Sequence, residues 1–417
     1  MLKLVTTTNS ENHQTLDELA RAGARAMIAK ALVLEANEYI ERHKDLVDDN
    51  GRRLVVKNGV AEERSVTVGS GTVKMRAPRV NDRREGEKFS SFILPAYVRK
   101  SPKVESLLPI LYLKGLSTSD FRSALEELLG AEATTGLSAS SITSLKKTWE
   151  KEFEEWSRKP IKTDYAYIWV DGVHVSIRLG EDKRLCLLVV IGVAKSGEKH
   201  LLAVGPGFRE SSESWATVLR DMRKRGLRAP LLAVGDGALG FWNALRSVDG
   251  FEATLEQRCW VHKIRNVLDV LPKRLHAEAK GLLHEMMNAS TRADAEKARD
   301  EFRSTVGSKF PKAIERIEKS WTELTAFFDF PAKHWIHLRT TNPIESSFAT
   351  VRLRSKITKG AGSAAAASAM AFKLLQDAET RWKKIRGSED LPLLMSRTVA
   401  YKDGVMLRAG EHHEISA

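Results

Sequence analysis

Three acidic residues of this sequence occupy positions in which a carboxylate could take part in chemistry. Asp171 follows the apolar run Tyr-Ile-Trp-Val, and Asp236 follows the run Leu-Leu-Ala-Val-Gly. Glu345 ends the string Arg-Thr-Thr-Asn-Pro-Ile-Glu, just before a basic stretch of helical character. Two carboxylates on strands and one on a helix could hold two Mg²⁺ ions, which prefer oxygen ligands and keep positions open for phosphate oxygens. The pattern therefore predicts metal-dependent phosphoryl transfer.

Each of these carboxylates also has an ordinary structural explanation. Asp171 and Asp236 both precede a glycine, and Asp-Gly is a common turn dipeptide. Asp236 could also cap a following helix, and Glu345 could stabilise a helix N-terminus after Asn342 and Pro343. The metal-site hypothesis depends on the three residues together, because their separations of 65 and 109 residues leave room for strands and helices between them.

The region 164–260 has to provide the strands that carry the two aspartates. Apolar runs predict five strands, at 166–177, 184–194, 199–204, 230–235 and 253–258. Capping and amphipathic patterns predict two helices, at 211–225 and 236–248. This order is typical of a mixed sheet with helices on both faces, within the α/β class. We expect Asp171 within the first strand and Asp236 at the carboxyl end of the fourth, on adjacent strands, because ligands gather at the carboxyl ends of strands in open sheets.

The remainder of the chain is predicted to be mainly helical. Residues 261–335 contain amphipathic patterns and no strand signal, and residues 342–385 return to helix with a break at Lys359-Gly-Ala-Gly. We expect five segments: 1–100, 101–160, a core formed by 161–260 with 336–390, a helical segment 261–335 within that core, and a tail 391–417.

The first 160 residues combine helices with a small β element. Residues 16–48 are rich in helix formers, whereas 51–85 alternate with period two around Asn-Gly and Gly-Ser-Gly, which indicates basic β-hairpins. In 101–157, two helical stretches flank a turn near 134–137, and the second carries Ser141, Ser144, Lys146 and Lys147. This arrangement resembles a DNA-binding helix-turn-helix, with an ordinary helical hairpin as the alternative.

The composition favours a polyanionic partner. The 417 residues carry a net charge of +13 at a pI of about 9.6, and segments 51–100 and 346–386 each carry +7. A solvated basic surface is the simpler explanation of either segment alone. The two cysteines, Cys186 and Cys259, exclude a disulfide framework and suit a reducing cytoplasm. No apolar run is long enough to predict a transmembrane helix.

Four strings give the sequence a specific resemblance. They are Trp169-Val-Asp-Gly, Val234-Gly-Asp-Gly, Gln257-Arg-Cys-Trp-Val-His-Lys-Ile-Arg-Asn-Val and Arg339-Thr-Thr-Asn-Pro-Ile-Glu. In this order they resemble bacterial insertion-sequence transposases of the Mutator type, over roughly residues 50–390. The resemblance implies an RNase H-like fold with an all-helical insertion before the last catalytic helix. It also implies an Asp-Asp-Glu triad at Asp171, Asp236 and Glu345 with Mg²⁺, for which Mn²⁺ could substitute. Phe348 departs from the asparagine that many relatives carry three residues after the glutamate.

Further residues are expected near this site. The Cys259-x₂-His262 pair lacks a second pair with zinc-ligand spacing, so we expect support of the site rather than a structural zinc, with a packed cysteine and a capping histidine as the alternative. Lys263 and Arg339 could hold phosphates, or lie on the solvated surface. Asn342 is expected beside the site, and two arginines of the basic helical stretch, Arg352 and Arg354, are expected to bind DNA.

The resulting hypothesis is a DNA transposase that binds terminal inverted repeats, cleaves DNA and joins the freed 3′ end to target DNA. Its partner would be double-stranded DNA, and bringing two ends together requires a dimer or a larger assembly. We expect such a protein in the bacterial cytoplasm, at the nucleoid. One alternative is an RNase H-like nuclease or resolvase that cuts without joining. Another is a non-enzymatic DNA-binding regulator, whose binding would be indifferent to Mg²⁺ and to loss of the carboxylates.

Overall fold

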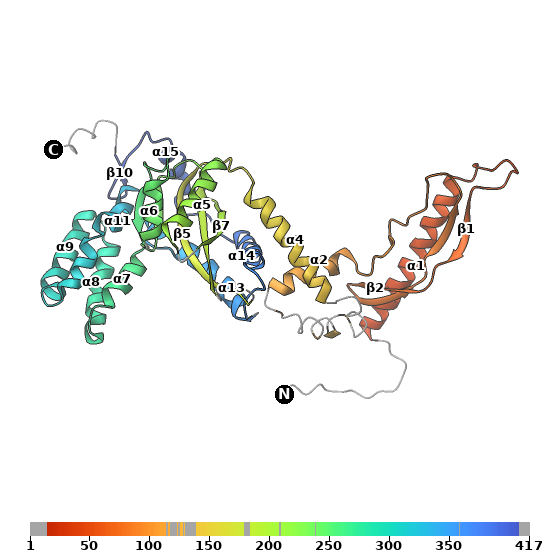
Figure 1. Cartoon of the computed structure of the whole chain (residues 1–417), viewed down its shortest axis with the longest axis horizontal. Coiled ribbons are helices and arrows are strands. Elements are labelled where there is room, and N and C mark those ends of the chain that lie inside the picture. Colours follow the sequence, from red (N-terminus) through yellow and green to blue (C-terminus); the bar gives the residue numbers. More distant parts are fainter. Residues whose placement is uncertain are drawn as a thin grey trace, which may run out of the picture. The chain divides into compact units, whose positions relative to one another are not determined.

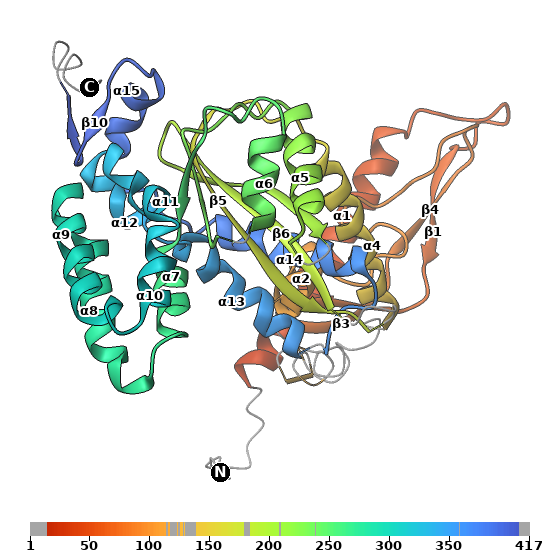
Figure 2. The same ribbon diagram turned by 60° about the vertical axis from the view of Figure 1, so that its left-hand side comes forward.

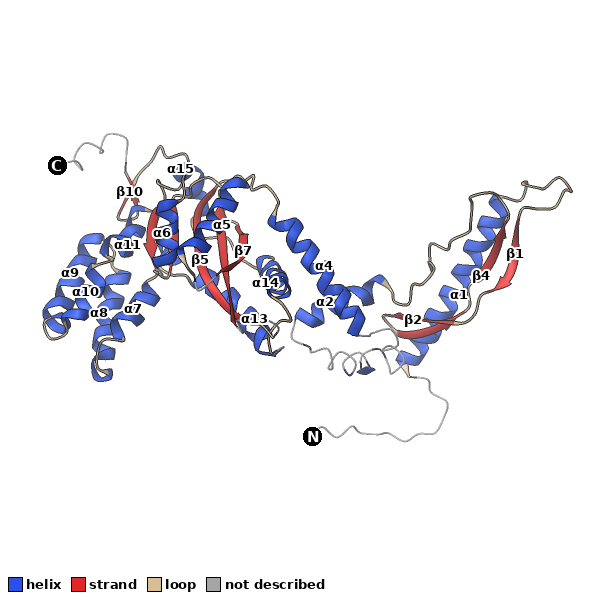
Figure 3. Cartoon of the chain, viewed as in Figure 1, coloured by secondary structure: helices blue, strands red, loops and turns tan. Residues whose placement is uncertain are grey.

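A computed structural model describes residues 15–113, 139–178, 184–207, 210–237, 239–357 and 359–407, and a few single residues between 116 and 129. The chain divides into two compact units, residues 1–145 and 146–417, and the boundary falls within helix α4 (Ala139–Ser157) (Figure 1). Helices make up much of each unit, as the colouring by secondary structure shows (Figure 3).

The first unit combines helices with two small antiparallel sheets. Its elements are α1 (Leu16–Arg42), β1 (Val55–Val60), β2 (Arg64–Val68), β3 (Gly71–Met75), β4 (Pro78–Asp82) and α2 (Pro102–Leu113). Thr15 and Glu18 form a capping box that starts α1. One side of α1 packs against the strands, with Leu32, Val66 and Val73 in a shared apolar core. The helix and the small β element are therefore present as predicted.

The two glycine turns predicted in this region have different outcomes. Gly69 and Ser70 connect β2 to β3, which begins at Gly71, in the expected hairpin. Asn58 and Gly59, by contrast, lie inside β1, where the pairing with β4 is irregular and Gly59 has a φ of +68°. The dipeptide forms a bulge rather than a hairpin turn. A glycine with positive φ occurs in both structures, so the sequence alone does not distinguish them. The first helix of the expected helix-turn-helix falls almost entirely outside the described residues.

A five-stranded mixed sheet forms the centre of the second unit. Its strands are β5 (Tyr165–Ser176), β6 (Arg184–Ala194), β7 (Lys199–Gly207), β8 (Leu232–Gly235) and β9 (Leu255–Arg258), in the spatial order β7-β6-β5-β8-β9. The first three strands pair antiparallel, whereas β5 pairs parallel with β8 and β8 with β9. All five strands predicted from the sequence are present, which confirms the mixed α/β class.

Helices cover both faces of this sheet (Figure 2). On one face, α5 (Ser212–Lys224) and α6 (Leu239–Ser247) pack on side chains such as Ile168, Val170 and Leu188. On the other face, α13 (Asn342–Ile357) packs on β5, and α14 (Ala364–Glu379) packs on β7. Successive strand residues point to opposite faces, so the alternate residues of β5 from Tyr167 to Val175 point toward α13.

All described elements between β9 and α13 are helical. They are α7 (Trp260–Leu268), η2 (Lys273–Leu275), α8 (His276–Asn288), α9 (Arg292–Phe302), the π-helix η3 (Arg303–Gly307), α10 (Pro311–Glu318), α11 (Trp321–Thr325), η4 (Ala326–Asp329), η5 (Ala332–His334) and α12 (Trp335–Leu338). We call residues 260–338 the helical block. The buried Gln257 of β9 joins the sheet to it, because its amide donates to the Leu324 carbonyl and accepts from Phe327 N–H.

The C-terminal part of the described chain returns to the helical block. It consists of η6 (Ser388–Asp390), α15 (Leu391–Met395) and a hairpin of β10 (Tyr401–Lys402) and β11 (Val405–Met406). Gly404, at the hairpin turn, exchanges backbone hydrogen bonds with Phe328 and Ala332. None of the helices in the described parts of the chain combines the length and apolar character needed to cross a membrane.

Candidate functional site

The register of the central strands brings the two aspartates to the same level of the sheet. In the parallel pair β5–β8, Trp169 lies opposite Val234. Asp171 follows two residues after Trp169 within β5, and Asp236 follows two residues after Val234, directly after the end of β8, which runs in the same direction. Strand residues rise by about 3.3 Å, so equal offsets from a paired position place both residues at the same level.

Helix α13 brings Glu345 to this level along the opposite side of β5. The Ser355 hydroxyl accepts a hydrogen bond of 3.0 Å from the backbone N–H of Ser176. From Ser355 back to Glu345 are ten helical residues, about 15 Å. From Ser176 back to Asp171 are five strand residues, about 16 Å. Because the two lengths agree, a helix lying along β5 carries Glu345 to the level of Asp171.

Two hydrogen bonds fix the segment that precedes α13 on the same face of β5. The Tyr167 hydroxyl bonds His334 Nδ1 at 2.7 Å, and the Trp169 indole donates to the His337 carbonyl at 3.1 Å. Tyr167, Trp169 and Asp171 are every second residue of β5, so their side chains point to the same face of the sheet. The segment that leads to Glu345 packs along this face.

The electrostatics of Asp171 indicate a crowded acidic site. Burial and the negative charge of Asp236 raise the pKa of Asp171 to about 7, with smaller contributions from Glu210 and Glu345. The N–H of Gly172 donates to the carboxylate at 2.8 Å and opposes the rise. The pKa of Glu210 is also raised, by burial and by Asp236. Asp171 and Glu210 are therefore both in surroundings that disfavour their charged forms, and Asp236 is the negative neighbour that acts on both.

Cys259 and His262 hold the N-terminal end of α13. Cys259 precedes α7, and its Sγ accepts hydrogen bonds of 3.3 Å from both the N–H and the hydroxyl of Thr341. The Thr341 hydroxyl also hydrogen-bonds the Glu345 carboxylate, and His262 Nδ1 lies 3.7 Å from the same carboxylate. Cys259, His262 and Glu345 thus present donor atoms within 4.8 Å of one another.

The titration of this group differs from that of isolated side chains. A hydrogen bond to Cys259 raises the pKa of His262 to about 9 against the effect of burial, and the charges of Glu345 and Asp236 add to the rise. Burial acts to raise the pKa of Cys259, but hydrogen bonds from His262 and Thr341 outweigh it and lower the pKa. His262 is therefore a cation at neutral pH, placed beside the acidic site.

The donor set of the acidic site fits a hard divalent cation. Asp171, Asp236 and Glu345 offer carboxylate oxygens, which are the ligands of Mg²⁺. A buried carboxylate whose main charged neighbours are other carboxylates favours a cation, because the cation would remove the repulsion that raises the pKa of Asp171. The residues present are thus suited to the predicted metal.

Two basic residues predicted near the site are engaged elsewhere. Lys263 is buried, and its Nζ donates to the Arg316 carbonyl at 2.7 Å and the Ser320 hydroxyl at 3.0 Å. Burial lowers the pKa of Lys263 to about 7, so it is a weak cation there. Arg339 donates to Asn288 at 3.0 Å, and its guanidinium lies over an aromatic ring 4.9 Å away. Neither interaction directs a charge toward the carboxylates.

The residues predicted on α13 differ in exposure. Asn342 is exposed at the start of the helix, and Arg352 is exposed with its guanidinium 5.6 Å from the Phe348 ring. Arg354 is only 1% exposed, which corrects its expected surface position. It falls on the buried stripe of α13 with Ile344 and Val351, at the three- and four-residue spacing of one helix face.

The residues predicted to read DNA lie in the first half of α4. Ser144 and Lys147 are exposed, and Lys146 is half-buried. Ser141 belongs to the helix, but its side chain lies outside the described part of the structure. A helix that presents Ser and Lys to solvent is compatible with phosphate contact.

Two residues of the site were not anticipated from the sequence. Glu210 joins the carboxylates although it lies in a loop before α5, where no periodic pattern marks it. Thr341 stands within the quoted Arg339–Glu345 string, but its contact with Cys259 is visible only in three dimensions.

Comparisons with known proteins agree in pointing to one family. The family described as "Transposase, Mutator family" matches residues 1–385. The transposase for insertion sequence element IS6120 of Mycolicibacterium smegmatis is 49% identical over 306 residues, which is 73% of this chain and 93% of that protein. The transposase for insertion sequence element IST2 of Acidithiobacillus ferrooxidans is 45% identical over 285 residues, or 68% and 95% of the two chains. The transposase for insertion sequence element ISRM3 of Rhizobium meliloti is 26% identical over 377 residues, 88% of each chain.

Proposed function

The chain belongs to the Mutator family of transposases, and we propose that it moves an insertion sequence by cleaving and joining DNA at Asp171, Asp236 and Glu345. The observation that supports this proposal is that Asp236 and Glu345, from distant parts of the chain, both contribute to raising the pKa of Asp171. Neighbouring parallel strands carry the two aspartates, and α13 brings the glutamate along β5. The fold we infer is RNase H-like, with the helical block as an insertion before the last catalytic helix.

The proposed reaction consists of two in-line phosphoryl transfers. Water adds to the phosphorus at the transposon end, the bond from that phosphorus to the 3′ oxygen breaks, and a 3′ hydroxyl is released. That hydroxyl then attacks a phosphorus of the target DNA and displaces another 3′ oxygen. No covalent bond to the protein is needed, so positioning and charge neutralisation provide the catalysis.

Asp171, Asp236 and Glu345 are the proposed ligands of the metal. These residues would hold two Mg²⁺ ions, for which Mn²⁺ would substitute, and the bound metal would supply activation of the attacking oxygen and stabilisation of the leaving oxygen. Thr341 and His262 keep the Glu345 carboxylate in place through their contacts with it. His262 also adds a positive charge where a phosphate would approach, since its pKa is raised to about 9.

We assign binding of the terminal inverted repeats to the first 160 residues. Arg53, Lys57, Arg76 and Arg79 of the β element are exposed, and so is Lys147 of α4. Lys and Arg side chains at such positions can neutralise backbone phosphates. Two transposon ends must meet for joining, so we propose that the protein acts on double-stranded DNA as a dimer or larger assembly.

Strand transfer with an end-containing DNA duplex and Mg²⁺ tests this function. Asp236→Asn should reduce joined products about 100-fold or more while leaving DNA binding intact, because a charged ligand is lost without a change in shape. Asp249→Asn is a matched control, since Asp249 is exposed in the loop after α6. Full activity of Asp236→Asn would refute the ligand assignment. Nicked products without joining would identify a nuclease or resolvase, and Mg²⁺-independent binding without any cleavage would identify a regulator.

A further inference from the structure

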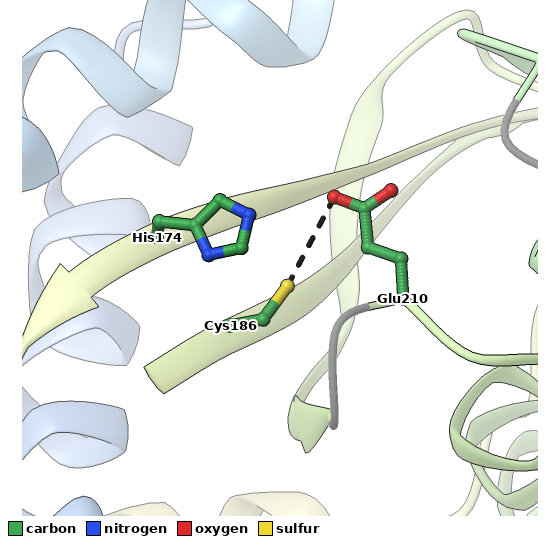
Figure 4. Close-up of side chains that lie close together, drawn as sticks. All are labelled: His174, Cys186 and Glu210. Carbon is green, nitrogen blue, oxygen red and sulfur yellow. Dashed lines mark hydrogen bonds between the residues drawn. The ribbon is translucent and has the colours of Figure 1, made fainter. Parts of the chain in front are cut away.

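Three potential metal ligands converge on the face of the sheet that α5 and α6 cover. His174 lies on β5, Cys186 on β6 and Glu210 in the loop that leads to α5. Their donor atoms all lie within 4.8 Å of one another, and the Cys186 thiol donates to Glu210 Oε1 at 3.9 Å. Figure 4 shows the three side chains pointing toward one another from separate segments.

His174 and Cys186 lie apart from the proposed catalytic carboxylates, whereas Glu210 is the acidic neighbour of Asp171 described above. Cys186 belongs to the apolar core beneath α5 and α6, together with Val170 of β5. His174 is an even number of residues from Val170, so it shares that face, whereas Asp171 points to the face of α13. The donors also differ, because a thiol and an imidazole are not ligands that Mg²⁺ selects.

The antiparallel pairing of β5 and β6 places two of the ligands side by side. His174 and Cys186 are direct partners in the register, and such partners have Cβ atoms about 4.5–5.5 Å apart on the same face. Their proximity is therefore fixed by the backbone hydrogen bonds of the sheet.

The backbone around Glu210 is shaped to bring its carboxylate to this pair. A Cβ atom at Gly172 would overlap the Glu210 carboxylate, and one at Gly240 would overlap the Glu210 backbone carbonyl. Glu210 itself has a φ of +53°, a left-handed conformation that residues other than glycine rarely adopt. Two glycines and one strained residue thus hold the carboxylate where it lies, which is typical of functional sites.

We propose that His174, Cys186 and Glu210 bind a zinc ion. Zinc takes thiolate sulfur at about 2.3 Å and carboxylate oxygen at about 2.0 Å in tetrahedral geometry, which separates the two ligand atoms by about 3.5 Å. The 3.9 Å between Cys186 Sγ and Glu210 Oε1 requires only a small adjustment. His174 is exposed and Cys186 is buried, so the ion would enter from the His174 side.

Zinc binding would replace the hydrogen bond between Cys186 and Glu210. The thiol proton leaves to solvent as the thiolate binds, and both side chains become ligands of the same ion. Three protein ligands leave a fourth position for water. The sequence did not indicate this site, because its ligands come from three elements and lack the short spacing of zinc motifs.

Metal content and a cobalt spectrum of the full-length protein test the proposal. The protein is stripped with a chelator, loaded with Zn²⁺ or Co²⁺ and desalted, without DNA. We expect a bound equivalent of zinc per chain and, with Co²⁺, a thiolate charge-transfer absorption. Cys186→Ser should remove that equivalent and the absorption, and His174→Ala should weaken Zn²⁺ binding about tenfold or more. His174 is exposed, so its replacement leaves the core intact.

Cys259→Ser is the matched control. It removes the other cysteine, which lies with His262 and Glu345 in the second cluster of comparable spacing. The zinc equivalent and the cobalt absorption should survive in Cys259→Ser. The proposal would be overturned if the zinc equivalent and the cobalt absorption were lost in Cys259→Ser but kept in Cys186→Ser. Absence of zinc from the wild-type protein would also overturn it. Strand-transfer activity does not enter this test, so its outcome is independent of the proposed function.

Discussion

Replacing Asp171 by asparagine should stabilise the metal-free protein at alkaline pH. The ordinary pKa of 3.8 is raised to about 7 in the folded state, chiefly by burial and by Asp236. A carboxylate with a raised folded pKa disfavours folding when ionised, so this cost is absent below pH 4, grows between pH 4 and 7 and is complete above pH 7. The difference between the two pKa values corresponds to about 4 kcal/mol. Asparagine keeps the shape and removes the charge, so a gain of about 2–4 kcal/mol is expected at pH 8.5 after local relaxation.

Thermal unfolding followed by circular dichroism in EDTA measures this gain. For a unit of this size, 2–4 kcal/mol corresponds to a rise in Tm of about 4–16 °C. At pH 5.5 the gain should be about half that at pH 8.5, because Asp171 of the folded protein is then mostly protonated. Asp164→Asn is the control: Asp164 precedes the same strand, is 48% exposed and pairs with Arg228 at 3.2 Å. That exposed pair should contribute less than about 1 kcal/mol at either pH.

Magnesium should reduce the difference in stability between Asp171→Asn and the wild-type protein. A cation held by the carboxylates stabilises the folded wild-type protein by mass action, whereas Asp171→Asn lacks one ligand and gains less. The gap in Tm should therefore close as Mg²⁺ is added at pH 8.5. An Asp171→Asn protein no more stable than wild type in EDTA at pH 8.5, or equally stabilised at both pH values, would refute the reasoning about burial and like charges.

Three further changes probe the surroundings of the site. Gln257→Leu should lower the unfolding free energy by about 1–3 kcal/mol in a denaturant titration, because it leaves the buried Phe327 N–H of the helical block without its acceptor, while the Leu324 carbonyl still accepts from the Trp260 indole. Thr341→Val should lower stability by about 1–2 kcal/mol and reduce strand transfer, because it removes the hydroxyl bonded to Glu345; a matching loss in DNA binding would contradict a role limited to that carboxylate. In metal-free Cys259→Ser, Cys186 should be alkylated about 1,000-fold more slowly than a free thiol at pH 8, with a rate that rises tenfold per pH unit, because burial raises its pKa to about 12; a rate that is independent of pH would contradict this.

The strands of the sheet were predictable because their sequence signal is local. β5, β6 and β8 are buried on both faces, and such strands appear as continuous apolar runs. Asp171 interrupts one run and Asp236 follows another, so the contrast between carboxylate and apolar neighbours was visible without the fold. The expected adjacency of the two strands is confirmed, since β5 and β8 pair directly.

Features that depend on distant partners could not be predicted in the same way. Glu210, in the loop before α5, approaches Asp171 because Gly172 of β5 leaves space for its side chain. Asn58-Gly59 forms a bulge rather than a turn because β1 pairs with β4 and not with its sequence neighbour. Arg354 shows the opposite case: the spacing of Ile344, Phe348 and Val351 already marked its face of the helix as buried, but the high basic charge of the segment outweighed that signal.

The position of Glu345 depends on the two ends of the helical block, where Cys259 and Trp260 contact Arg339 and Thr341, more than on the interior of the block. Cys259 accepts two hydrogen bonds from Thr341, 82 residues away, and Trp260 donates to the Arg339 carbonyl at 2.9 Å. The two ends of the helical block therefore lie side by side, and the block is an insertion whose ends are held together. The free-energy cost of bringing the two ends of an insertion together changes only slowly with its length, so residues added within the block should leave Glu345 in place. A substitution of Cys259 or Thr341, by contrast, acts directly on the start of α13, because Thr341 contacts both Cys259 and the Glu345 carboxylate.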